Sequence, residues 1–259
     1  MRSVRLLGTV LAALVAATPA VDAGERAPVF VELYTSQGCA PCRIADAYMG
    51  ELVRRPDVIP LSFHIDYWDS PVWHDQFALP EATQRQRAFR KSFGMNYVYT
   101  PQIVVDGRAH VSGRLRDRIE GLIAEARRRD SVPVTLTRGA NGTVTVELPG
   151  ENAAPAPLSD RAPTGAARET ASVWMLLYDR PHTVDIRGGQ NSGQRITYYN
   201  VVREMKRIGS WNGTAQSITL LMSEATLKER AGVVIMLQQN DGGPILGAAA
   251  LPFDGANSS

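Results

Sequence analysis

The hydrophobic pattern of the first half of the chain alternates between strand-like runs and stretches of helical period. Short apolar runs predict buried strands, and apolar positions three or four residues apart predict amphipathic helices. Strands that alternate with helices are typical of an α/β domain, which we expect over residues 26–130. The predicted strands cover residues 29–34 and 58–66, and the predicted helices cover residues 42–55, 81–93 and 114–129.

Beyond residue 130 the pattern changes to short β-rich runs separated by turns. Residues 132–137 and 143–148 flank a turn and predict a hairpin. A segment rich in Ala, Pro and Gly over 149–170 predicts an exposed loop. Residues 131–259 are therefore expected to form a β-rich, sandwich-like domain. Its further predicted strands cover residues 172–178, 182–186, 196–202, 218–222 and 233–238.

The first 23 residues have the pattern of a secretory signal peptide. Arg2 and Arg5 precede an apolar stretch at 6–17 that is too short to span a membrane as a mature helix. Small residues at Val21 and Ala23 predict cleavage after Ala23, with an uncleaved anchor as the alternative. We therefore expect a periplasmic or extracellular protein with no membrane contact after cleavage, because no second spanning segment follows.

Composition narrows the class of partner. The chain has 259 residues, of which 44% are hydrophobic, and a net charge of +2, as in an ordinary globular protein. The basic run at 114–129 is interleaved with apolar residues at helical spacing, which indicates the solvated face of a helix. We therefore expect no nucleic-acid partner.

The chain has two cysteines, Cys39 and Cys42, in a CxxC motif. In an oxidising compartment thiols normally pair. A disulfide that stabilises a fold usually closes a long loop, because the entropy it removes from the unfolded chain grows with loop length. The Cys39–Cys42 pair closes almost no loop. The spacing therefore favours redox exchange or metal binding over a structural disulfide.

The predicted elements around the motif indicate how the two thiols would divide the chemistry. A β-rich run and a short loop precede Cys39, and a helical period begins at Cys42. Unpaired N–H groups and the dipole at the start of a helix favour a thiolate. We therefore expect Cys39 to be the nucleophile and Cys42 to resolve the mixed disulfide.

Two ionisable side chains are candidates to assist these thiols. Glu32 interrupts an otherwise apolar strand, and it either accepts the proton of Cys42 or faces solvent with no chemical role. His64 with the two thiols would make a soft site for copper or zinc. A histidine on a strand is more often packed in a core, so we predict no resident metal and no other cofactor.

Six segments of the chain form a set of motifs in a fixed order. They are Glu32-Leu-Tyr-Thr-Ser-Gln-Gly-Cys39, Phe63-His-Ile-Asp-Tyr-Trp-Asp69, Thr83-Gln-Arg-Gln-Arg87, Tyr99-Thr-Pro-Gln-Ile-Val-Val-Asp-Gly107, Arg187-Gly-Gly-Gln-Asn-Ser-Gly193 and Tyr199-Asn-Val-Val-Arg203. Together they resemble a secreted bacterial thioredoxin-like family of unassigned function. The similarity covers most of residues 28–130 and continues into the second half. Here Ala40-Pro41 separates the cysteines and Arg43-Ile44 follows them, where the family often has Ser-Ser and Pro-Pro, so the motif is closer to that of thioredoxins.

The resemblance implies a thioredoxin-like domain over 26–130 and gives Thr100-Pro101 a role. Thioredoxin-like domains place a cis-proline opposite the dithiol, and Pro101 fits that position. The backbone of Thr100 would then pair with an extended substrate. The alternative is an ordinary trans proline at the start of a strand.

The separation of Cys42 from Pro101 exceeds what a minimal domain of this kind needs, which implies a helical insertion over 68–97. Trp68 and Trp73 belong to this insertion. We expect them to bind substrate in an aromatic groove beside the first cysteine.

The sequence therefore predicts a thiol-disulfide oxidoreductase acting on protein or small-molecule thiols and disulfides. The alternative is a copper- or partner-binding module without turnover. Asn191, Asn200 and Arg203 form either a partner or ligand site, or simply a turn and a solvent-facing strand. The expected catalytic residues are Cys39, Cys42, Pro101 and Glu32, and the expected substrate-binding residues are Thr100, Trp68 and Trp73.

Overall fold

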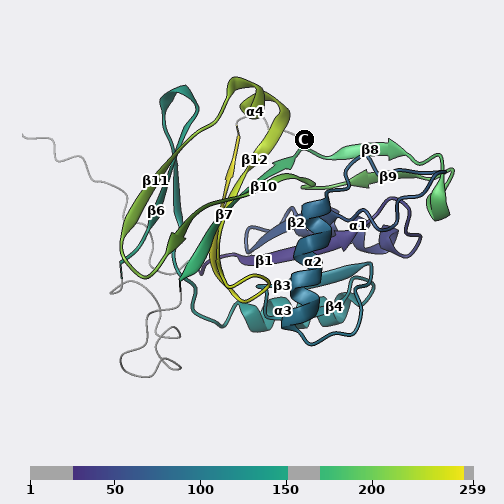
Figure 1. Ribbon diagram of the computed structural model, residues 1–259, viewed down its shortest axis with the longest axis horizontal. Helices are drawn as coiled ribbons and strands as arrows, with labels where there is room; N and C mark the ends of the chain where they lie inside the picture. The colour runs from purple at the N-terminus through teal and green to yellow at the C-terminus, as the bar shows by residue number, and fades with distance from the viewer. Residues whose placement is uncertain (1–25, 151–169, 254–259) are drawn as a thin grey trace, which may run out of the picture.

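The computed structural model describes residues 26–150 and 170–253 of the chain (Figure 1). The predicted signal peptide and most of the predicted loop over 149–170 lie outside the described residues. Within the described part, no helix is long and apolar enough to cross a membrane.

The elements of the first half follow the hydrophobic pattern closely. They confirm the two strands and three helices predicted there, with ends that differ by a few residues. Pro80 at the start of the second helix suits a position where its missing N–H costs no hydrogen bond. The elements are β1 (Val29–Thr35), α1 (Cys42–Leu52), β2 (Val58–His64), α2 (Pro80–Ser92), β3 (Gln102–Val105), β4 (Ala109–Ser112) and α3 (Arg116–Ala126).

The first sheet has the strand order β2-β1-β3-β4. Strand β1 pairs with β2 in parallel and with β3 in the antiparallel direction. Helices α1 and α3 cover one face of this sheet. Val31 and Leu33 of β1 pack there against Met49 of α1 and Ile119 of α3, and all four side chains are fully buried.

The second half contains two further sheets and a separate hairpin. One sheet has the order β10-β7-β12-β13 and the other β11-β6-β5, and an apolar core that includes Val146, Val173 and Ile235 lies between them. The elements are β5 (Thr135–Arg138), β6 (Thr143–Leu148), β7 (Ala171–Asp179), β8 (His182–Asp185), β9 (Arg195–Tyr198), β10 (Val202–Trp211), β11 (Gln216–Leu221), α4 (Glu224–Glu229), β12 (Arg230–Gln239) and β13 (Ile245–Pro252).

Two details of the second half differ from the prediction. The strand predicted over 196–202 is interrupted, because Asn200 has a φ of 45° and turns the chain between β9 and β10. Strand β10 overlaps a predicted run only at Val202, and β13 lies outside every predicted run. Most residues of β10 are partly buried or exposed and β13 is rich in Ala, so neither has the strong apolar signal of a central strand.

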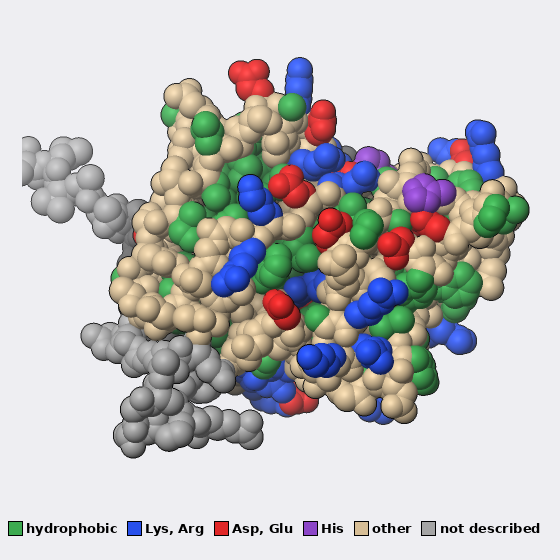
Figure 2. Space-filling model, viewed as in Figure 1, with side chains coloured by type: hydrophobic (Ala, Val, Ile, Leu, Met, Phe, Trp, Pro, Cys, Tyr) green, Lys and Arg blue, Asp and Glu red, His purple; other side chains and the backbone are tan. Residues whose placement is uncertain are grey.

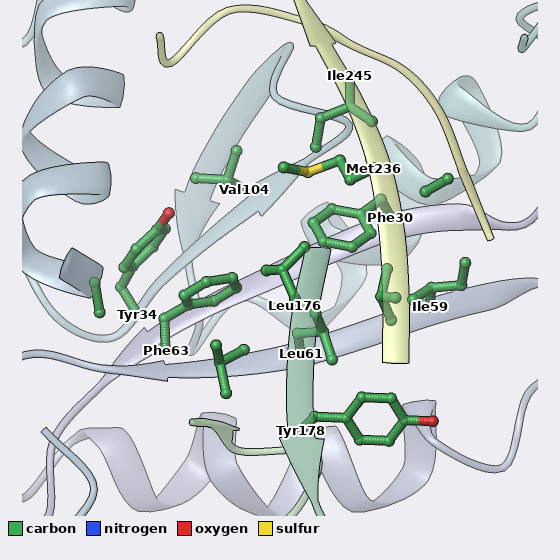
Figure 3. Close-up of a cluster of buried hydrophobic side chains, with 14 of the residues drawn as sticks. Phe30, Tyr34, Ile59, Leu61, Phe63, Val104, Leu176, Tyr178, Met236 and Ile245 are labelled. Atoms are coloured by element: carbon green, nitrogen blue, oxygen red, sulfur yellow. The ribbon is translucent and has the colours of Figure 1, made fainter. Parts of the chain in front are cut away.

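The two halves share a hydrophobic core. Phe30 and Tyr34 lie on the face of β1 opposite α1, where they pack with Leu61 of β2, Leu176 of β7 and Met236 of β12 (Figure 3). Helix α2 packs against the same cluster through Ala82 and Phe89. The sheet of the second half therefore helps to bury the sheet of the first.

The β8–β9 hairpin runs beside α1 toward the end of the molecule where that helix begins (Figure 1). Its base is fixed to the edge of β2, because the N–H of Ser62 donates to the carbonyl of Asn200 at 3.0 Å and the Asn200 side chain donates to the carbonyl of Pro60 at 3.0 Å. Gly50 of α1 permits the approach, since a Cβ atom there would lie 2.6 Å from the ring of Tyr199. The hairpin thereby brings its turn to the CxxC loop.

Candidate active site

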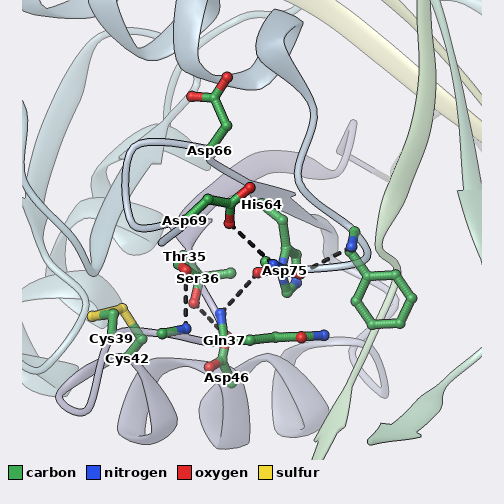
Figure 4. Close-up of polar contacts among 12 residues, drawn as sticks. Thr35, Ser36, Gln37, Cys39, Cys42, Asp46, His64, Asp66, Asp69 and Asp75 are labelled. Carbon is green, nitrogen blue, oxygen red and sulfur yellow. Dashed lines mark hydrogen bonds and ion pairs between the residues drawn. A yellow bond between two sulfur atoms is a disulfide. The ribbon is translucent and has the colours of Figure 1, made fainter. Parts of the chain in front are cut away.

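Cys39 and Cys42 form a disulfide where the loop after β1 enters α1 (Figure 4). The N–H of Cys42 donates to the carbonyl oxygen of Cys39 at 3.1 Å. Neither cysteine has exposed surface. The pair therefore lies at the positive end of the α1 dipole and is covered by neighbouring segments.

Three of the predicted residues lie together beside the disulfide. The Thr100–Pro101 peptide bond is cis, and Pro101 is buried. The hydroxyl of Thr100 lies 3.4 Å from the sulfur of Cys39 and accepts a hydrogen bond at 2.8 Å from the indole N–H of Trp68. The segment between β2 and α2 therefore contacts the site through Trp68.

Trp73 lies further along the same segment between β2 and α2. It packs beside Gly188 and Gly189 of the loop after β8 and lines a surface pocket together with Gln37 and Arg187. Its contacts therefore connect this segment to the β8–β9 hairpin. The structure brings Trp68 to the disulfide more directly than Trp73.

Glu32 is not brought together with the cysteines. Its side chain lies on the face of β1 opposite α1, where Arg85 of α2 donates to the carboxylate at 2.6 and 2.9 Å. The hydroxyl of Tyr34 donates a third hydrogen bond at 2.8 Å. Arg85 also donates to the side chain of Gln238 in β12 at 2.7 Å. This arrangement makes Glu32 part of the contact between the halves.

A carboxyl that the sequence reasoning missed, Asp46, lies one helical turn after Cys42. It is buried, and one of its oxygens accepts a hydrogen bond at 2.8 Å from the hydroxyl of Thr35. Burial raises the pKa of Asp46 to about 7, although nearby His64 and the Thr35 hydrogen bond lower it. The signal in the sequence was an acidic residue on the apolar face of a predicted helix.

His64 and Asp75 form a second buried polar pair behind the CxxC loop (Figure 4). The imidazole Nδ1 lies 2.7 Å from the Asp75 carboxylate, which also accepts the N–H groups of Gln37 at 2.8 Å and Phe77 at 2.9 Å. Burial raises the pKa of Asp75, but His64 and the backbone donors outweigh it, so this pKa lies below its ordinary value.

The metal alternative requires several ligands to converge on one point. Within the described residues, no group of three or more His, Cys, Asp or Glu side chains is arranged to hold a metal ion. The Nδ1 atom of His64 is already bonded to Asp75.

The three polar residues singled out in the second half have different positions. Asn191 is buried against the CxxC loop and donates to the carbonyl of Cys39 at 2.9 Å. Asn200 bonds β2 at the base of the hairpin. Arg203 lies 3.6 Å from the carboxylate of Asp179 and over the ring of Phe77. The structure therefore brings only Asn191 to the disulfide.

The fold and the site together define a mixed α/β protein with a buried CxxC disulfide at the start of a helix. The chain belongs to the family described as "Protein of unknown function (DUF1223)", which matches residues 30–238. No curated protein matches the chain.

Two solved structures are similar to the chain. Protein AGR_C_4864 from Agrobacterium tumefaciens is 30% identical, with a TM-score of 0.74 over 92% of this chain and 99% of that one. HBP35 of Porphyromonas gingivalis is 13% identical, with a TM-score of 0.56 over 90% of this chain and 77% of that one. The second similarity is one of fold alone.

Proposed function

We propose that this protein is a thiol-disulfide oxidoreductase built on a thioredoxin-like domain. The observation that carries the proposal is the Cys39–Cys42 disulfide at the start of α1 with the cis Thr100–Pro101 bond and the Thr100 hydroxyl beside it. A short CxxC loop supported by polar groups suits exchange better than the stabilisation of a fold.

The proposed exchange has two steps. In the reduced protein the Cys39 thiolate attacks a substrate disulfide, which forms a mixed disulfide and releases one substrate thiolate. The Cys42 thiolate then attacks the sulfur of Cys39, which releases the second substrate thiolate and closes the protein disulfide. The substrate gains two electrons and two protons, and the protein dithiol loses them. A separate thiol reductant restores the dithiol, and the reverse sequence oxidises a substrate dithiol.

Asp46 is the proposed acceptor of the Cys42 proton, in place of Glu32. Its pKa of about 7 suits proton exchange near neutral pH, and it lies on the same helical face as Cys42. Glu32 is instead neutralised by Arg85 on the other face of the sheet.

Replacing Asp46 with asparagine is expected to slow closure of the disulfide about 10²-fold, because the resolving thiol loses its proton acceptor. The reduced protein is mixed with a chromogenic aromatic disulfide, and the release of the first and second aromatic thiols is followed separately. Only the second release should slow, and the wild-type rate should rise with pH through about 7.

The same variant tests the pKa of Asp46. A carboxyl whose pKa is higher in the folded chain binds more protons when folded, so the free energy of unfolding falls as pH rises from 3.8 to about 7. Asp46→Asn should lack the contribution of Asp46 to that fall, while the exposed control Asp185→Asn should retain it. Burial also raises the pKa of Asp106, to about 6, so a smaller fall should remain in every variant. Equal rates of thiol release and equal pH profiles in Asp46→Asn and the wild type would contradict this role.

Export to the periplasm or the cell exterior by the predicted signal peptide fits this chemistry, since disulfide exchange is common in those compartments. The proposed partners are protein or small-molecule thiols and disulfides. Basic and acidic side chains are interspersed on the face shown in Figure 2, which gives no support to a nucleic-acid partner.

Turnover tests the function. The mature protein should accelerate the reduction of a model protein disulfide by a thiol, the oxidative refolding of a reduced model protein, or both. Both cysteines are buried, so a substrate reaches Cys39 only when covering residues such as Trp68 move. Absence of acceleration in both assays, with a disulfide that reduces only in denaturant, would make the disulfide structural.

A further inference from the structure

The loop over 187–194, between β8 and β9, contacts the backbone of the CxxC loop although the two are far apart in the sequence. Asn191 is 2% exposed, and its side-chain amide donates to two carbonyl oxygens, those of Gln37 and Cys39, each at 2.9 Å. One side chain of the second half therefore bonds both carbonyls, and the Cys39 carbonyl also accepts the N–H of Cys42.

Gln190, the preceding residue, bonds two further backbone groups of the same loop. Its N–H donates to the carbonyl of Gly38 at 3.3 Å, and its side-chain oxygen accepts the N–H of Ala40 at 3.1 Å. The backbone of residues 37–40 is therefore held at every residue by two adjacent residues of the 187–194 loop.

Glycine allows this close contact. Gly189 has a φ of 69°, and a Cβ atom there would lie 3.2 Å from the α-carbon of Gly38. A Cβ atom on Gly188 would lie 2.4 Å from the carbonyl oxygen of Val72 in the insertion. Side chains at these positions would push the loop away from both neighbours.

These contacts affect the two redox forms differently. The N–H of Ala40 directly follows Cys39 in the loop before α1, where a free N–H group would stabilise a Cys39 thiolate. Gln190 engages that N–H with the negative end of its amide dipole and so opposes the thiolate. Asn191 fixes the loop in the shape that holds the two sulfurs together, which raises the effective concentration of one thiol at the other.

We propose that Asn191 and Gln190 are positioning residues by which the second half of the chain biases the Cys39–Cys42 pair toward its disulfide form. This inference rests on the proposed function for its physiological meaning. The bias itself is a property of the disulfide, measurable whether or not the protein turns over a substrate.

The test is the equilibrium of the full mature chain with glutathione buffers, measured for the wild type, Asn191→Ala and Gln190→Ala. The variants should shift the equilibrium constant toward the dithiol, about tenfold for Asn191→Ala, because the Gln37 carbonyl loses the Asn191 donor and the Cys39 carbonyl keeps only its bond from Cys42. Gln190→Ala should shift it about two- to fivefold through the thiolate. Gln194→Ala is the matched control, because the side chain of Gln194 accepts from the side chain of Arg43 rather than bonding the backbone of residues 37–40.

A second measurement separates the two roles. In a Cys42→Ser background, the rate at which iodoacetamide alkylates Cys39 is followed against pH. Gln190→Ala should move the midpoint to lower pH, while Gln190→Glu, which keeps an acceptor oxygen and adds a negative charge, should not. The titratable and charged groups near the loop, namely Arg43, Asp46, His64 and Asp75, are the same in every variant.

Gln190 is exposed, so its replacement should leave the fold intact. Equilibrium constants and alkylation midpoints equal to those of the wild type in both Asn191→Ala and Gln190→Ala would overturn the inference. A shifted equilibrium in a protein without turnover would retain this inference and refute the oxidoreductase. Normal turnover with unshifted equilibria would retain the oxidoreductase and refute this inference.

Discussion

Reduced protein carrying Cys42→Ser is expected to accumulate a mixed disulfide between Cys39 and its substrate, because no thiol remains to attack the sulfur of Cys39. Cys39→Ser should accumulate none and should lose turnover by about 10³-fold or more, since it lacks the nucleophile. Gel mobility without reductant and mass spectrometry of the trapped peptide measure both outcomes.

The expected difference between the two variants follows from the positions of the two cysteines. Cys39 lies before the helix and beside Thr100, whereas Cys42 is the first residue of α1 and is followed by its buried apolar face. Ala40→Ser is the control, because it changes the CxxC loop and keeps both thiols. Trapping through Cys42 in the Cys39→Ser protein would reverse the assigned roles, and no trapping in either variant would argue against exchange.

Replacing Glu32 with alanine is expected to destabilise the protein by about 3–5 kcal/mol, because Arg85 would remain buried without its partner. Both side chains are nearly or fully buried, and the two hydrogen bonds between them are 2.6 and 2.9 Å long. Denaturant unfolding of the oxidised protein, followed by fluorescence, measures the change.

An exposed pair in the same protein provides the control. Glu51 of α1 pairs with Arg116 of α3, and both side chains are more than half exposed to solvent. Glu51→Ala should change stability little, since exposed pairs gain little over solvation. If Glu32 served the cysteines instead, Glu32→Ala would leave stability near that of the wild type and slow the second thiol release.

The Glu32–Arg85 pair also affects the site, although it does not contact the cysteines. Arg85 joins β1 to Gln238 of β12, so it helps to dock the sheet of the second half. The β8–β9 hairpin that contacts the CxxC loop belongs to that half. We therefore expect loss of the pair to weaken the disulfide only through the fold, in proportion to the loss of stability.

The amino-acid sequence alone determined the local features of the fold. The helix from Cys42 was predictable because a 3.6-residue period needs only neighbouring positions. The same held for α2 and α3. Prediction from the hydrophobic pattern failed at Asn200, where one turn conformation divides a β-rich run. It also failed at β13, whose Ala-rich residues become a strand only by pairing with β12.

For the candidate site, the sequence alone provided the spacing of the two thiols and the order of strand, loop and helix around them. The tertiary structure decided which side chains surround them. Thr100 and Asn191 contact Cys39 from 61 and 152 positions away, and Glu32, only seven positions away, lies on the other face of its strand. The physical reason is that sequence patterns report which side of an element is buried, whereas packing between elements decides what each buried side meets.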